Sequence, residues 1–138
     1  MTDQQPQHRF GGVVFTQLSV MMFLQFFVWG AWYVTMGPYM NANGMDGKIA
    51  MAYTVGPIAA IISPFFLGMI ADRFFSSERV LASMHMLGGI FLCLAPMAAQ
   101  QSENLFIVAI LAHMLCYMPT LGLTSSLAMH NMTNSEKQ

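Results

Sequence analysis

Apolar residues follow one another along this chain in four long runs, separated by short polar connectors. The runs cover about residues 17–40, 49–71, 80–99 and 104–129. A helix needs roughly 20 apolar residues, at about 1.5 Å of rise each, to cross the hydrocarbon core of a bilayer. Every run meets that length. The pattern therefore predicts an all-α membrane protein with four transmembrane helices.

The charged residues support these four spans. All of the Lys, Arg, Asp and Glu residues lie in the connectors, in the tails or on their borders. A charge at the centre of a membrane helix costs several kcal/mol on insertion scales, so this segregation is what membrane spans require. The composition, 56% hydrophobic and 8% charged with a net charge of −1, excludes a soluble enzyme and a nucleic-acid-binding protein.

The basic residues predict how the spans are oriented. Four of them flank the spans on one side: Arg9, Arg73, Arg79 and Lys137. Only Lys48 falls on the other side. Positive residues accumulate on the cytoplasmic side of membrane proteins. We therefore expect both termini in the cytoplasm, with residues 1–16 and 131–138 as cytoplasmic tails.

Polar and aromatic residues recur at helical spacing inside the first and fourth runs. They are Gln25, Trp29, Trp32, His113, Tyr117 and Thr120. Steps of four and three residues place each trio on one face of its helix. Polar groups inside spans usually face a bundle interior or a watery path, so we predict that these six residues line a pocket for a flat, hydrogen-bonding solute. The alternative is that the polar residues cross-link helices and the Trp residues sit at the lipid interface.

The sequence gives little indication of metal binding or catalysis. His85 and His130 have no Cys or His partner at three- or four-residue spacing, and no Ser/His/Asp or Cys/His arrangement is credible. We expect no metal ion, no cofactor and no catalytic residue. Small multidrug exporters have a similar length, but they carry a membrane-embedded Glu in their first helix. Here Gln25 is the polar residue of that helix and no run contains a carboxylate, which disfavours that class.

The connector after the second run resembles a known loop signature. Gly68-Met-Ile-Ala-Asp-Arg73 is similar to the start of the motif G-x-L-A-D-R-x-G-R-K of the major facilitator superfamily, between its second and third helices. The resemblance implies that Gly68, Asp72 and Arg73 form a gating loop whose charges hold one gating state across the two halves. Phe75 replaces the motif's Gly and serines replace its basic pair, and we expect Arg79 to compensate in part.

Longer segments narrow the resemblance. The stretch from Leu24 to Met40 is similar to the first helix of the bacterial nucleoside permeases, the nucleoside:proton symporter family. Cys116-Tyr-Met-Pro-Thr-Leu-Gly-Leu123 is similar to that family's fourth helix, and Ser63 to Phe74 fits the end of its second. The likeness covers nearly the whole chain apart from the first dozen or so residues.

The resemblance implies a larger protein. Family members have twelve helices in two six-helix halves, so this chain is identified as an N-terminal fragment, a partial first half. Residues 131–138 would then begin the linker to a fifth helix. The resemblance places most nucleoside-gripping residues, and the acidic residues that carry the coupled proton, outside this chain.

We therefore predict a transporter that imports nucleosides across the cytoplasmic (inner) membrane by proton symport and alternating access. Its expected partners are a nucleoside, protons, the lipid bilayer and the remaining helices, and no nucleic acid. Two alternatives stay open. One is an efflux carrier of another small solute, because a fold does not determine its cargo. The other is a non-transporting four-helix membrane scaffold.

Overall fold

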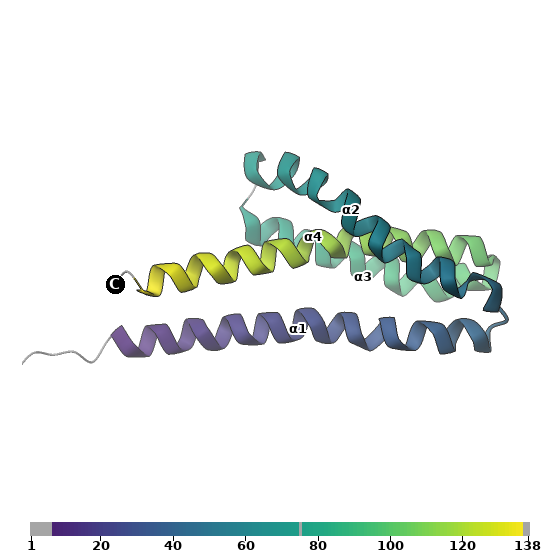
Figure 1. Ribbon diagram of the computed structural model, residues 1–138, viewed down its shortest axis with the longest axis horizontal. Coiled ribbons are helices and arrows are strands. Elements are labelled where there is room, and N and C mark those ends of the chain that lie inside the picture. The colour runs from purple at the N-terminus through teal and green to yellow at the C-terminus, as the bar shows by residue number, and fades with distance from the viewer. Residues whose placement is uncertain (1–6, 75, 137–138) are drawn as a thin grey trace, which may run out of the picture.

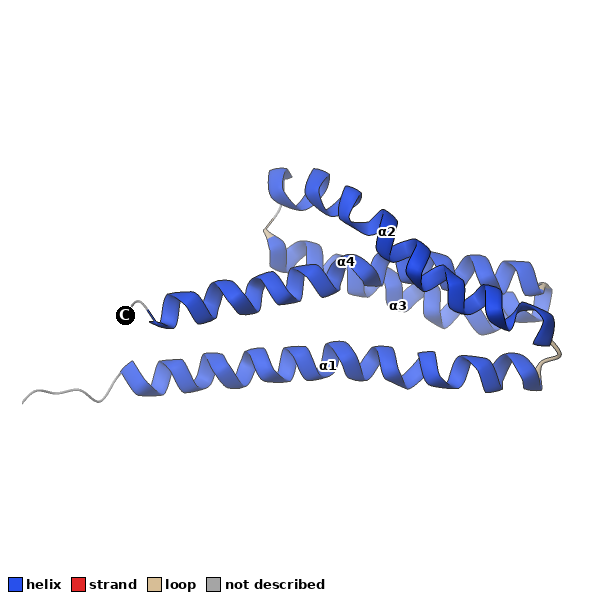
Figure 2. Ribbon diagram, in the orientation of Figure 1, coloured by secondary structure: helices blue, strands red, loops and turns tan. Residues whose placement is uncertain are grey.

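The computed structural model describes residues 7–74 and 76–136, with side chains described for residues 12–63, 65 and 76–131. This part of the chain consists of helices joined by tight turns (Figures 1 and 2). In chain order the elements are α1 (Gln7–Ala42), the 3₁₀ helix η1 (Asp46–Lys48), α2 (Ile49–Phe74), α3 (Ser77–Gln101) and α4 (Glu103–Glu136).

Three stretches of the described residues are long and apolar enough to cross a membrane. They are Gly12–Ala42 in α1, Ser77–Gln101, which is the whole of α3, and Glu103–Asn131 in α4. They coincide with three of the four predicted spans. Much of the second half of α2 lies outside the described side chains, so the span over residues 49–71 stays a prediction. The chain is an all-α membrane protein.

Two helices are longer than the apolar runs that predicted them. Helix α1 begins at Gln7 rather than near residue 17, and α4 continues to Glu136 rather than ending near residue 129. An apolar run marks only the part of a helix that suits hydrocarbon. The helix itself continues while its backbone hydrogen bonds can form, and residues 7–37 contain no proline to interrupt α1.

Helix α1 ends in a Schellman motif. The Met45 N–H donates to the Met40 carbonyl (2.9 Å) and the Gly44 N–H donates to the Asn41 carbonyl (3.1 Å). Gly44 has a φ of +72°, which glycine adopts without a steric penalty. Met40 and Met45 are both buried in the same apolar core, at the two positions that form the apolar pair of this motif. The motif turns the chain back so that α2 can pack against the other helices.

A single residue joins α3 to α4. The backbone N–H of Ser102 donates to the Ala98 carbonyl and closes α3, while its Oγ accepts from the Leu105 N–H (3.1 Å). This second bond satisfies one of the free donors at the start of α4, the usual task of an N-terminal capping serine. Because the turn is so short, α3 and α4 run antiparallel in close contact.

Helix α4 is the centre of the arrangement, since α1, α2 and α3 all pack against it. The main apolar core lies where α1 meets α2 and α3 meets α4, and we call this end of the bundle the closed end. Its buried residues are Met36, Met40, Met45, Ala52, Val55, Ala59, Ala95, Phe106, Ile107, Ile110 and Met114. At the opposite end the helices spread apart, and α2 diverges from α1 and α4 (Figure 1).

Small residues let the helices approach one another. A Cβ built on Gly88 of α3 would lie 3.4 Å from the Cβ of Cys116 and 3.5 Å from Nδ1 of His113, both on α4. A Cβ on Gly56 of α2 would lie 3.1 Å from Cε of Met114. Close approach at small residues is how membrane helices gain packing energy when the surrounding lipid is as apolar as their side chains.

Candidate functional site

The polar residue at the middle of α1 is buried against α4. Gln25 is only 3% exposed. Its Nε2 donates to Oγ1 of Thr120 (2.6 Å), and the Tyr117 hydroxyl donates to the backbone carbonyl of Gln25. Helices α1 and α4 are therefore joined at Gln25 through both its side chain and its backbone.

Helix α3 reaches the same point through His85. Its Nε2 lies 2.9 Å from Oε1 of Gln25. Thr120 in turn donates from Oγ1 to the Tyr117 carbonyl (2.6 Å). Four residues from three helices thus form one hydrogen-bonded group, Gln25, His85, Tyr117 and Thr120, which we call the Gln25 node.

Aromatic rings close on one another beside this node. Trp29 contacts Tyr117 with ring centroids 6.2 Å apart, and Trp32 meets His113 edge to face at 4.9 Å. His113 stacks on Tyr117 at 5.8 Å, and Tyr33 contacts both Trp rings at 5.6–5.7 Å. We call these five residues, three from α1 and two from α4, the aromatic cluster. Separations and tilts of this kind are those that aromatic pairs prefer.

Three nitrogens in the cluster are buried without a hydrogen-bond partner among the described residues. They are Nε1 of Trp29, Nε1 of Trp32 and Nε2 of His113. Nδ1 of His113 lies 2.8 Å from the Gly88 carbonyl. Because a carbonyl oxygen only accepts, Nδ1 carries the proton of the neutral ring and Nε2 presents a lone pair. The cluster therefore holds two free donors and one free acceptor.

Unpaired buried polar atoms cost about 1–3 kcal/mol each, so their presence calls for an explanation. The three nitrogens are covered by the protein's own side chains. A ligand would reach them only after the rings or the helices that carry them move. In a protein that changes conformation, such atoms are suited to a partner that binds in another state.

The structure brings all six predicted site residues together between α1 and α4. They divide into two kinds. Gln25 and Thr120 bond to each other and to other protein atoms, while Trp29, Trp32 and His113 keep polar atoms free. Tyr117 uses its hydroxyl on the α1 backbone. That these residues bind a solute stays a prediction.

His85 and Tyr33 belong to the same site and were not predicted there. His85 is a lone polar residue in an otherwise apolar face of the third run, so it forms no stripe of its own. Its signal is that an imidazole inside a membrane span needs a polar partner. Tyr33 directly follows Trp32, and neighbours in sequence point in different directions on a helix. Nothing in its spacing marks it.

The predicted gating loop is described only in part. The side chains of Gly68, Asp72 and Arg73 lie outside the described residues. Arg79 lies in the first turn of α3 with its side chain exposed, and its backbone N–H donates to the Ser76 carbonyl (3.0 Å). A gating role for these four residues stays a prediction.

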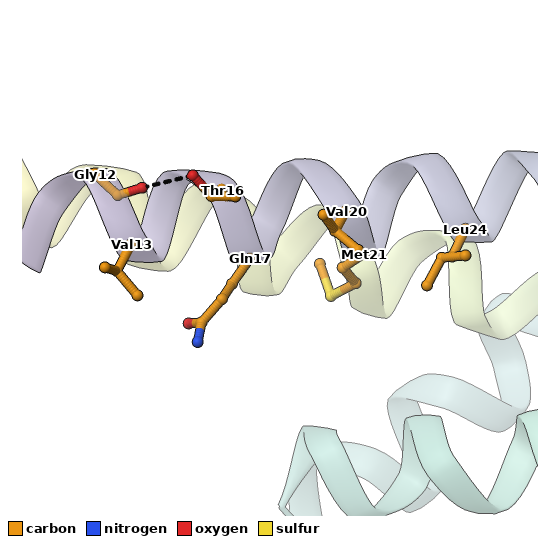
Figure 3. A pocket seen from close by; sticks show the side chains of 7 residues that line it. All are labelled: Gly12, Val13, Thr16, Gln17, Val20, Met21 and Leu24. Atoms are coloured by element: carbon orange, nitrogen blue, oxygen red, sulfur yellow. Dashed lines mark hydrogen bonds between the residues drawn. The ribbon is translucent and has the colours of Figure 1, made fainter.

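A shallow apolar hollow lies elsewhere, along residues 12–24 of α1 (Figure 3). All of the described residues that line it come from this one helix, so they form an open surface rather than a site between helices. Within the described part of the chain, no group of three or more His, Cys, Asp or Glu residues is placed to hold a metal ion.

Comparison with known proteins assigns this sequence to a family. The family described as Nucleoside H+ symporter matches residues 13–138. The Escherichia coli K12 protein YegT is 40% identical over 88% of this chain, and nucleoside permease NupG of the same strain is 38% identical over 86%. Xanthosine permease of that strain is 36% identical over 81%. No solved structure matches the chain.

The matched regions are only part of these relatives. The chain spans 27–28% of the length of the three proteins. The family match, in contrast, covers almost all of the chain. It includes both helices that supply the aromatic cluster. The chain belongs to the nucleoside H+ symporter family.

Proposed function

We propose that this chain is the N-terminal part of a transporter that imports nucleosides through the cytoplasmic membrane by proton symport. The observation that carries the proposal is the family match over residues 13–138. The names of two relatives, nucleoside permease and xanthosine permease, agree with it. The candidate site also supports the proposal, because it combines flat rings with free hydrogen-bonding atoms near the middle of α1.

A nucleoside has a flat base and a ribose with several hydroxyls. The rings of Trp29, Trp32 and Tyr117 offer faces on which a base can stack. The two indole N–H groups can donate to base carbonyls or ribose oxygens, and Nε2 of His113 can accept from a hydroxyl or a base N–H. Each unpaired atom of the aromatic cluster thus has a matching group on such a substrate.

The buried atoms become exposed to a substrate during alternating access. In this mechanism, helix bundles rock around a site near the bilayer midplane. The helices of this chain are packed at the closed end and spread apart at the other (Figure 1). A bundle held at one end can open at the other with little change in its core. In the proposed orientation, with both termini cytoplasmic, the spread end faces the cytoplasm.

Uptake of radiolabelled uridine, inosine and xanthosine by cells that lack their own nucleoside transporters tests the proposal. Cells that express the full-length transporter are expected to accumulate nucleoside, and a protonophore is expected to reduce accumulation to the level of a vector control. Uptake that never exceeds the vector control contradicts nucleoside import. Uptake that a protonophore leaves unchanged contradicts proton coupling.

A preloading arm separates import from efflux. Cells loaded with labelled nucleoside and then diluted are expected to retain it better when the transporter and the proton gradient are both present. Faster loss of label, together with no uptake, would assign the protein to export instead.

A further inference from the structure

The hydrogen bonds of the Gln25 node admit a single arrangement of protons. The Tyr117 carbonyl can only accept, so Thr120 donates its one hydroxyl proton there. Thr120 Oγ1 must then accept from Gln25, which turns the amide NH₂ of Gln25 toward α4. The amide oxygen consequently faces α3, and Nε2 of His85 must carry a proton to bond with it.

Thr120 fixes the orientation of the amide, and His85 supplies the donor that this orientation requires at the α3 end. The amide oxygen of Gln25 needs a donor, because Gln25 is buried away from water. An N–H at position 85 meets that need, and an apolar side chain there would leave the oxygen unpaired.

The position of α1 depends on the His85 side chain. Helix α3 packs mainly on α4, and the His85–Gln25 bond links α3 directly to α1. The His85 ring also contacts the Tyr117 ring, with centroids 6.1 Å apart. Gln25 lies on the same face of α1 as Trp29 and Trp32, one and two turns away. A shift of α1 at Gln25 therefore moves both indole rings relative to His113 and Tyr117.

We propose that His85 is a positioning residue of the substrate site: by donating to Gln25 it holds α1 in register with α4 and so places the Trp29 and Trp32 rings against His113 and Tyr117. This inference rests on the proposed nucleoside transport. His85 touches no substrate in this account, because its Nε2 is already used by Gln25. The atoms left for the substrate belong to the aromatic cluster.

Uptake kinetics in the full-length transporter test this role with four variants. His85→Leu removes the donor, His85→Gln keeps an N–H group of similar reach, Gln25→Leu removes the acceptor, and a double variant combines the two Leu substitutions. His85→Leu is expected to raise the KM for uridine roughly tenfold, the order of effect expected when a buried amide oxygen is left without a donor. The maximal rate per transporter in the membrane is expected to change by less than about threefold.

The other variants separate positioning from simple structural damage. His85→Gln is expected to restore KM to within about threefold of the parent, and the double variant to be no worse than Gln25→Leu alone, since both changes break the same bond. Met86→Leu, next in sequence and 70% exposed, is the matched control and should leave KM unchanged. An unchanged KM in His85→Leu, an equal rise in His85→Gln, or additive effects in the double variant would overturn the proposal.

A spectroscopic arm does not depend on transport. The full-length protein in lipid is labelled selectively with ¹⁵N-histidine, and its NMR signals are compared with those of His85→Gln. The signal missing from the variant belongs to His85 and should be that of a ring protonated at Nε2. Gln25→Leu should shift this signal. If the parent transports no nucleoside while this signal is as expected, the proposed function fails and the His85–Gln25 bond stands. A signal from a ring that lacks a proton on Nε2 would refute the positioning role whatever the uptake shows.

Discussion

Helices α1, α3 and α4 are held together by different means at the closed end and at the Gln25 node. At the closed end, methionine, alanine, isoleucine and phenylalanine side chains fill the space between helices, and Met40 is completely buried. At the node, α1, α3 and α4 meet through an amide, an imidazole, a phenol and a hydroxyl. One region consists of apolar packing, and the other consists of directed hydrogen bonds.

The two kinds of contact contribute differently because the surrounding solvent is lipid. Close packing drives the association of membrane helices, whereas hydrogen bonds between spans average only about 0.6 kcal/mol but require defined distances and angles. We therefore assign stability to the closed end and the placement of the aromatic cluster to the node. Substitutions in the two regions should separate loss of protein from loss of substrate affinity.

The largest effect is expected at the contact between α3 and α4. A Cβ on Gly88 fits at 3.4–3.7 Å from Cys116 and His113, so Gly88→Ala should be tolerated. Gly88→Leu places further atoms where α4 already lies and should force the helices apart, with loss of most folded protein from the membrane fraction. Quantitative immunoblotting of purified membranes compares the two variants. Equal amounts of both would show that this contact does not limit folding.

Met40→Ala tests the closed end. Met40 is fully buried in the apolar core, so its truncation should lower the free energy of unfolding by about 2–5 kcal/mol. The protein that remains folded should keep its KM for uridine, because the cavity lies away from the node. Unfolding in mixed detergent micelles and uptake assays provide the two readouts. A raised KM with unchanged stability would reverse the proposed division of roles.

Gln25→Leu is the complementary change at the node. It should cost only about 1 kcal/mol of stability, since spans exchange weak hydrogen bonds for apolar contact. The KM for uridine should rise roughly tenfold or more, because α1 loses its side-chain bonds to both α3 and α4. A stability loss as large as that of Met40→Ala, with no change in KM, would make the node a structural element only.

A smaller effect is expected where α2 touches the backbone of α1. The Tyr53 hydroxyl donates to the Tyr33 carbonyl and accepts from the Gly37 N–H, both at 3.1 Å. A Cβ on Gly37 would lie 3.0 Å from that hydroxyl. Gly37→Ala should displace it and lower stability by about 1 kcal/mol.

Gly30→Ala is the matched control for this change. It lies on the same helix, and a Cβ there meets no atom of the described residues within 4 Å. It should be neutral or slightly stabilising, because alanine favours a helix more than glycine does. Equal unfolding curves for the two alanine variants would show that the Tyr53 contact contributes nothing.

The apolar runs predicted the all-α membrane fold correctly, because hydrophobic length is a one-dimensional property of a sequence, while the ends of the spans stay predictions. The sequence also predicted which residues share a face, and Gln25 and Thr120 do meet across α1 and α4. It did not reveal His85 as their partner, since spacing within one helix says nothing about which neighbour faces it. The Tyr53 bond to the α1 backbone was equally invisible, because the backbone groups that it contacts leave no mark in the sequence.

The most direct test of the account is Trp32→Phe, which keeps an aromatic ring and removes the unpaired Nε1 donor. Thermal unfolding and uridine affinity would be measured on the same purified full-length transporter. We predict that stability is unchanged or slightly higher, since a buried donor without a partner is removed, while the Kd for uridine rises about five- to tenfold. An unchanged Kd, or a loss of stability with no loss of affinity, would contradict the claim that these nitrogens are kept free for the substrate.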